Sequence, residues 1–252
     1  MFLTNWLKGL YNSVFKPTEV ISQTAIKNVP AVPGIQFCAN YDGLTAKATQ
    51  IMQEIADEIG LPTVSFKVLL KADLTKDVLE AERSTIKQKG RLEIFCGHGT
   101  PEVLLGPYIS DTEEIIRNNT LHSPLYTEEM IPNGGVALLA FCCSSGSVLG
   151  TKFIYHPGNS FMGFKSLIFF YFNDNTFMEK FGEILKATIM TILVSEKMEK
   201  GHKNQLYDLY TQVIRYFKFG EGRRLKKSFE YSLLFADQRQ KLTYMEFGQV
   251  VQ

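Results

Sequence analysis

Residues 136–142 have the sequence Val-Ala-Leu-Leu-Ala-Phe-Cys, an unbroken apolar run that follows the turn sequence Asn133-Gly134-Gly135. An apolar run of this length after a glycine turn is typical of a strand with both faces buried. Similar runs lie upstream, at 35–39, 64–70 and 92–96. Strands that are apolar on both faces belong to parallel sheets with helices on either side.

Amphipathic segments separate these strands. Residues 44–59 place Ile51 and Ile55 on one helical face, and residues 73–89 form a second expected helix before a glycine stop. Downstream we expect a strand near 161–172 and helices at about 176–200 and 202–218. The alternation predicts an α/β fold: a mostly parallel sheet sandwiched by helices, with additional C-terminal helices.

The composition is that of an ordinary globular protein. The chain has 252 residues, of which 45% are hydrophobic and 21% charged, and its formal net charge is +1. A charge this close to neutral argues against nucleic acid as a partner. We expect residues 1–33 to form an N-terminal amphipathic helix (1–15) and a linker, and residues 34–252 to form one domain.

The location that we expect is the cytoplasm. The first residues lack the charged start, the continuous apolar stretch and the cleavage site of a secretory signal. The longest apolar segment, 161–172, contains Gly163 and Lys165 and is too short for a transmembrane segment.

A histidine and a cysteine stand where two expected strands end. His98 follows the strand at 92–96, and Cys143 follows the strand at 136–142. Functional groups of parallel sheets gather beyond the carboxyl ends of the strands, so neighbouring strands would bring imidazole and thiol together. A free thiol has a pKa near ~8.5, and a nearby imidazole raises the thiolate fraction. The spacing predicts a catalytic Cys143–His98 dyad.

The glycines around His98 fit the same chemistry. Gly97 and Gly99 allow unusual backbone angles and close approach of a substrate. The backbone amides of Gly99 and Cys143 are the expected oxyanion donors, each worth about 3–4 kcal/mol in the transition state. Side chains alternate along a strand, so Cys142 should face away from Cys143 and belong to the core.

The two segments resemble those of caspase-like cysteine peptidases. Cys96-Gly97-His98-Gly99 is similar to the Ser-Gly-His-Gly segment of metacaspases, and residues 141–147 are similar to their Asp-Cys-Cys-His-Ser-Gly-Ser segment. The second segment also resembles the Ala-Cys-x-Ser/Thr-Gly segment of CHAT-domain peptidases. Both comparisons select Cys143 as the nucleophile. The resemblance covers residues 34–172 and implies a cysteine endopeptidase that cleaves a protein or peptide substrate.

The resemblance also implies a biological setting and a pocket. These families act in regulated cell death and, among prokaryotic relatives, in defence that includes antiviral defence, so a regulatory protein partner would fit. Asp42 and Phe141 are the expected substrate-pocket residues. Phe141 replaces the acidic residue that helps metacaspases accept Arg or Lys, which puts a basic preference in doubt. Asp42 before Gly43 also fits a simple turn.

Three alternatives stay open at this point. A catalytically silent caspase-like module would bind partners and leave Cys143 unreactive. A different thiol hydrolase or transferase is the second alternative, although no glycine-rich phosphate loop follows the first strand. A metal site of Cys96, His98 and Cys143 is the third, but it lacks a fourth ligand in a spaced motif. We therefore expect neither a metal nor a cofactor.

Overall fold

A computed structural model describes residues 33–39, 43–59, 66–86, 91–108, 122–195 and 197–248. The strands are β1 (Gly34–Ala39), β2 (Phe66–Lys71), β3 (Leu92–Cys96), β4 (Leu104–Tyr108), β5 (His122–Tyr126), β6 (Ala137–Phe141), β7 (Ser160–Phe164) and β8 (Leu242–Glu246). The α-helices are α3 (Gly43–Ile59), α4 (Lys76–Thr85), α6 (Leu149–Phe153), α7 (Asn175–Ser195), α8 (Lys200–Phe219) and α9 (Ser228–Lys241). The predicted helix at 1–15 lies outside the described residues.

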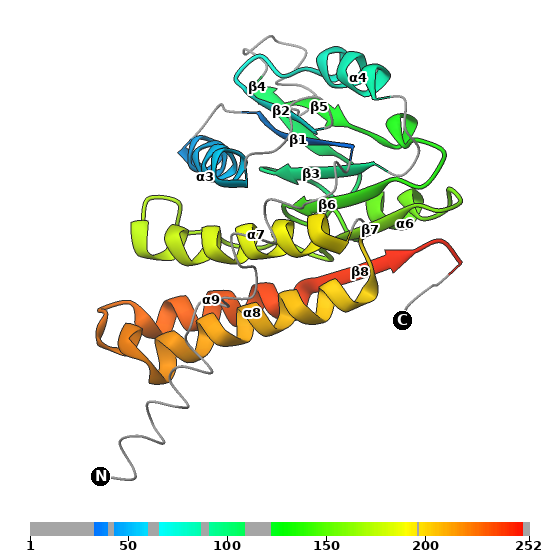
Figure 1. The fold of residues 1–252 in the computed structure, drawn as a ribbon. Coiled ribbons are helices and arrows are strands. Elements are labelled where there is room, and N and C mark those ends of the chain that lie inside the picture. Colours follow the sequence, from blue (N-terminus) through cyan, green and yellow to red (C-terminus); the bar gives the residue numbers. More distant parts are fainter. Residues whose placement is uncertain are drawn as a thin grey trace.

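A six-stranded sheet organises the fold, in the order β2-β1-β3-β6-β7-β8. The pairs from β2 to β7 are parallel, and β8 closes one edge as an antiparallel strand (Figure 1). The predicted α/β class with a mostly parallel sheet is confirmed. β4 and β5 form a separate antiparallel pair.

Two apolar clusters cover the two faces of the sheet. On one face, side chains of α3, α7, α8 and α9 pack together with alternate residues of the central strands. On the other face, α4, α6 and the β4–β5 pair pack on the intervening residues. β3 is buried along its whole length and β6 at all but its first residue, which explains why their sequences are almost entirely apolar. Of the helices within the described residues, none combines the length and apolar character that crossing a bilayer requires.

The C-terminal part differs from the expected purely helical ending. α9 runs directly into β8, which pairs with β7 from Ser160↔Glu246 to Phe164↔Leu242 (Figure 1). The strand expected near 161–172 ends at Phe164, and residues 165–174 form a connection to α7 instead. The apolar composition of this connection explains the error, because periodicity cannot separate a short apolar strand from an apolar loop.

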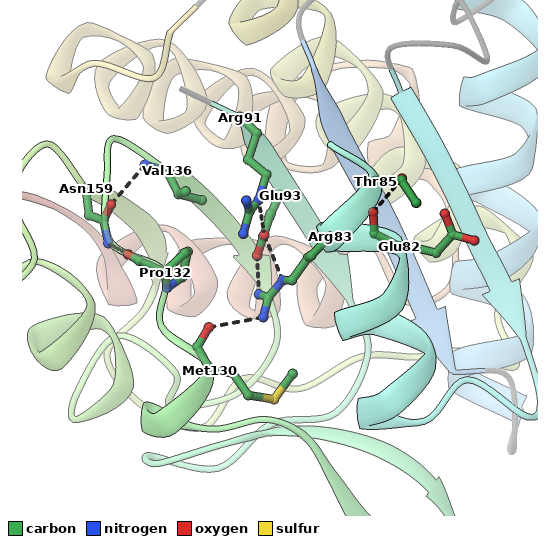
Figure 2. Close-up of polar contacts among 9 residues, drawn as sticks. All are labelled: Glu82, Arg83, Thr85, Arg91, Glu93, Met130, Pro132, Val136 and Asn159. Atoms are coloured by element: carbon green, nitrogen blue, oxygen red, sulfur yellow. Dashed lines mark hydrogen bonds and ion pairs between the residues drawn. The ribbon is translucent and has the colours of Figure 1, made fainter. Parts of the chain in front are cut away.

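One charged network is buried beside the sheet (Figure 2). Glu93 is the second residue of β3 and is 0% exposed, and Arg83 of α4 is 8% exposed. Arg83 donates through Nε and a terminal nitrogen to the two carboxylate oxygens of Glu93, at 2.9 and 2.5 Å. Arg91 donates to the same carboxylate at 2.7 Å. This network fixes α4 against β3, the strand that leads to His98.

Candidate functional site

His98 and Cys143 follow two neighbouring strands at the end of the sheet where the carboxyl ends of the parallel strands lie. β3 and β6 are parallel, and their register ends with Cys96 opposite Phe141. The amide of Gly97 donates to the carbonyl of Phe141 at 3.2 Å, which extends the pairing past the strands. His98 and Cys143 each follow these paired residues by two positions, and both are half-buried. The sheet therefore brings the two segments side by side.

Gly99 makes the close contact between these segments. A Cβ at this position would lie 2.7 Å from the sulfur of Cys142 and 3.0 Å from the carbonyl oxygen of Cys143. The first distance is shorter than real Cβ contacts and the second is tighter than most of them, so a side chain would push the segments apart. Gly99 is needed for its size rather than for an unusual φ angle.

The chain after His98 is held by a β-bridge. Gly99 pairs with Leu104 in an antiparallel bridge, in which the amide of Thr100 donates to Val103 and the amide of Leu105 donates to His98. In this pattern the amide of Gly99 points away from its bridge partner. The Gly99 amide therefore takes no part in the hydrogen bonds of this bridge.

We expect Gly99→Ala to lower the free energy of unfolding by about 1–3 kcal/mol, because the added methyl group overlaps two packed atoms. Gly201→Ala is a matched control, since a Cβ there meets no described atom within 4 Å. A helical Ala in place of Gly should leave stability unchanged or raise it by about 0.5–1 kcal/mol. Urea denaturation of both variants measures the difference. Equal stabilities would contradict the close contact.

Cys143 opens a tight turn. The next residue, Ser144, has a φ of 56°, a left-handed conformation that non-glycine residues rarely adopt. The amide of Ser144 donates to Ser166 at 3.1 Å, and the amide of Gly146 donates to Phe164 at 2.8 Å. These bonds fix the turn to the end of β7. Strained residues held in this way cluster at functional sites.

Cys143 is the accessible thiol of the four. Cys38, Cys96 and Cys142 are buried, and Cys143 is half-buried. Burial raises the pKa of Cys142 to about 12 and that of Cys96 well above its ordinary value. The predicted core position of Cys142 is confirmed, because it packs with the cluster opposite to the one that Cys143 contacts. Reagents in solution should therefore reach Cys143 first.

The sulfur of Cys143 is held by Ile168 in the 165–174 connection. The thiol donates to the carbonyl of Ile168 at 3.3 Å, and the amide of Ile168 lies 3.5 Å from the sulfur. Burial raises the pKa of the thiol above its ordinary value, although the Ile168 amide, the charge of Lys241 and the amide of Cys143 itself lower it. At neutral pH the thiol is protonated in this arrangement.

Sequence reasoning missed the role of the 165–174 connection. It carries a row of large side chains that are half-exposed or exposed, including Leu167 at 53% and Phe169 at 55%. These residues flank Ile168 on either side and therefore lie next to the contact with Cys143. In the strand expected near 161–172, these apolar side chains would be buried. The sequence alone does not show that they are exposed in a connection instead.

The two expected pocket residues have different outcomes. Asp42 lies outside the described residues. Phe141 is 1% exposed, and its ring lies 5.9 Å from the ring of Phe164 and 5.8 Å from that of Phe181. It is a core residue, so it does not line an open pocket here. Its ring packs toward Phe181 of α7, in the same apolar cluster against which Cys143 packs.

The structure gives no support to a metal site within the residues it describes. No group of three His, Cys, Asp or Glu side chains there is placed to hold an ion. Cys96, one of the considered ligands, is 3% exposed and belongs to the core. A cavity of about 320 Å³ lies at the opposite edge of the sheet, lined by Leu92, Ala137 and Ser160 at the starts of their strands. It is therefore separate from Cys143.

The arrangement of these segments can support nucleophilic chemistry at a thiol. It joins a half-buried cysteine, a histidine on the adjacent strand end, and a glycine amide directed away from its own bridge partner. Such groups are those that acyl transfer through a thioester requires. Comparison of the sequence with models of known protein families and with curated proteins gives no match.

Proposed function

We propose that the protein is a caspase-like cysteine endopeptidase with Cys143 as the nucleophile and His98 as the general base and acid. The observation that supports this proposal most is the parallel pairing of β3 with β6, which brings side by side the strand ends that precede His98 and Cys143. The strained Ser144 and the close contact of Gly99 with Cys143 add support. Resemblance of both segments to metacaspases and CHAT-domain peptidases supports the substrate class, a protein or peptide.

The proposed reaction begins when the sulfur of Cys143 attacks the carbonyl carbon of the scissile peptide bond. The thiol proton passes to His98, and the amides of Gly99 and Cys143 stabilise the oxyanion. Collapse of the tetrahedral intermediate breaks the C–N bond, and His98 protonates the leaving amine. Water, deprotonated by His98, then hydrolyses the thioester. The thiol and the imidazole are both regenerated.

The contact with Ile168 has a consequence for this mechanism. The thiol hydrogen-bonds to Ile168, and burial raises its pKa, so the arrangement corresponds to a resting state. Transfer of the thiol proton to His98 requires release of the Ile168 contact. A regulatory protein partner or a cleavage that shifts residues 165–174 would supply this change, in line with the regulated pathways of the families it resembles.

The same observation favours a second candidate function. A thiol that stays bonded to Ile168 with a raised pKa is a poor nucleophile, as expected of a caspase-like module that only binds partners. Reactivity of Cys143 separates the two candidates. The peptidase requires a fraction of thiolate near neutral pH, whereas the binding module does not.

Reaction with peptidyl electrophiles tests the proposal. The full chain is incubated at pH 7 with a set of peptidyl chloromethyl ketones, with and without calcium, and adducts are located by mass spectrometry. We expect modification of Cys143 that depends on the peptide, together with hydrolysis of members of a peptide library. An inert Cys143 across all peptides, in a protein that remains folded, would support the binding module instead.

A further inference from the structure

Lys241 connects the end of α9 to the segment that contacts Cys143. Its ammonium group donates to the carbonyl of Leu167 at 2.5 Å and to the carboxylate of Asp237 at 2.6 Å. Its own carbonyl accepts the amide of Lys165 at 2.9 Å. Side chain and backbone of one residue therefore hold the 165–168 segment at two points. The side chain is 23% exposed, so its charge is only partly screened by water.

Other residues of α9 hold the same connection. Gln238 donates to the carbonyl of Phe169 at 2.7 Å, and Glu230 accepts the hydroxyl of Tyr171 at 3.1 Å. One face of α9 thus follows residues 167–171 along their length. The helix continues directly into β8, so the sheet fixes its end (Figure 1).

The sulfur of Cys143 contacts the residue that follows Leu167, the residue bound by the Lys241 ammonium. Ile168, which follows Leu167, provides the carbonyl and the amide that meet the sulfur at 3.3 and 3.5 Å. The ammonium of Lys241 binds Leu167, the residue next to Ile168, and its charge lowers the pKa of the Cys143 thiol. A positive charge near a thiol favours the thiolate.

We propose that Lys241 is a positioning residue for Cys143: it fixes the 165–168 segment against the sulfur and supplies positive charge that favours the thiolate. The proposal rests on the proposed function, since it assigns a role at the same site. Asp237 would tune this role, because its carboxylate partly neutralises the lysine. Cys142, on the same segment as Cys143, is a further titratable group that interacts with it, and His98 follows the adjacent strand β3.

The pH dependence of Cys143 alkylation tests this role without requiring proteolysis. The full chain reacts with iodoacetamide between pH 6 and 10, and mass spectrometry quantifies the adduct on Cys143. The midpoint is the pH at which the rate of Cys143 alkylation reaches half of its maximum. We expect Lys241→Met to raise this midpoint by about 0.5–1 pH unit, because the thiolate loses a neighbouring cation. Lys241→Arg should keep the midpoint near that of the wild type, because it retains the charge. Lys218→Met, at an exposed position of α8, is the control.

Asp237→Asn gives a result of opposite sign. It keeps the bond from Lys241 to Leu167 but removes the neutralising carboxylate, so the midpoint should fall. A purely structural clamp would change the rate of alkylation in both variants without moving the midpoints in opposite directions. An unchanged midpoint in Lys241→Met, or a raised one in Asp237→Asn, would overturn the proposal. The second variant remains informative if Lys241→Met does not fold.

The two proposals fail in different ways. If Lys241→Met and Asp237→Asn shift the midpoint as expected but no peptide is cleaved by the wild type, the peptidase proposal fails and the role of Lys241 stands. If peptides are cleaved through Cys143 and the midpoints do not respond, only the role of Lys241 is overturned.

Discussion

Cleavage by the Cys143→Ala protein is expected to fall by about 10⁴-fold or more, to the background rate of the assay. Removing the sulfur removes the covalent step. The measurement is kcat/KM on a peptide selected from a library that the wild type cleaves. Position 143 is half-buried, so alanine should leave the fold intact.

Cys142→Ala is the matched control for this prediction. It removes a thiol from the adjacent residue, whose side chain packs on the opposite face of the sheet. Its stability should fall by about 1 kcal/mol, since a small buried group is lost, while cleavage persists. Loss of cleavage in Cys142→Ala with full activity in Cys143→Ala would contradict the assignment of the nucleophile.

His98→Ala should lower kcat/KM by about 10²–10⁴-fold, the usual contribution of a general acid and base. This effect is smaller than that of Cys143→Ala, because a thiol without a general base retains some reactivity of its own. An effect on KM alone would instead place His98 in substrate binding.

The strands of the central sheet were predictable because burial on both faces leaves a simple pattern. β3 and β6 are apolar from end to end apart from Glu93, and each was placed within a residue of its observed bounds. The order of the strands did not follow from the sequence. The adjacency of β3 and β6, on which the candidate site depends, was an assumption that the observed pairing supports.

α9 and β8 were missed for identifiable physical reasons. α9 buries Tyr231 and Phe235 but exposes Phe229 and Leu233, so its apolar residues do not gather on one face. β8 follows it without an intervening turn, and no glycine or proline marks the boundary. Without these elements, sequence reasoning had no means of finding Lys241 beside the candidate nucleophile.

Arg83→Met is the second change with a large expected effect, this time on stability. It should lower the free energy of unfolding by about 3–5 kcal/mol, because it leaves the carboxylate of Glu93 buried with only one of its two arginine partners. The loss includes the bond from Arg83 to the carbonyl of Met130 (Figure 2). It also includes the stacking of the guanidinium on Tyr126, 4.2 Å from the ring centre. Urea denaturation at pH 7 measures the difference.

Lys76→Met provides the matched control, since it removes a surface ion pair of the same helix. Lys76 lies 3.6 Å from Glu129, whose side chain is 84% exposed. Exposed pairs of this kind contribute at most about 1 kcal/mol, so the variant should unfold close to the wild type. Equal losses in the two variants would show that the buried network contributes no more than a surface pair.

The pH dependence of the Arg83→Met effect follows from Glu93. Burial alone would raise the pKa of this carboxyl, but the charges and hydrogen bonds of Arg83 and Arg91 lower it below its ordinary value of 4.5. A carboxyl whose pKa is lower in the folded than in the unfolded state stabilises the fold at pH values above the unfolded-state pKa. This contribution is lost as the pH falls from there through the folded-state pKa. The stability difference between wild type and Arg83→Met should therefore be largest above about pH 4.5 and narrow in acid. A difference that stays constant down to pH 3 would assign the loss to packing on Tyr126 rather than to the buried charge.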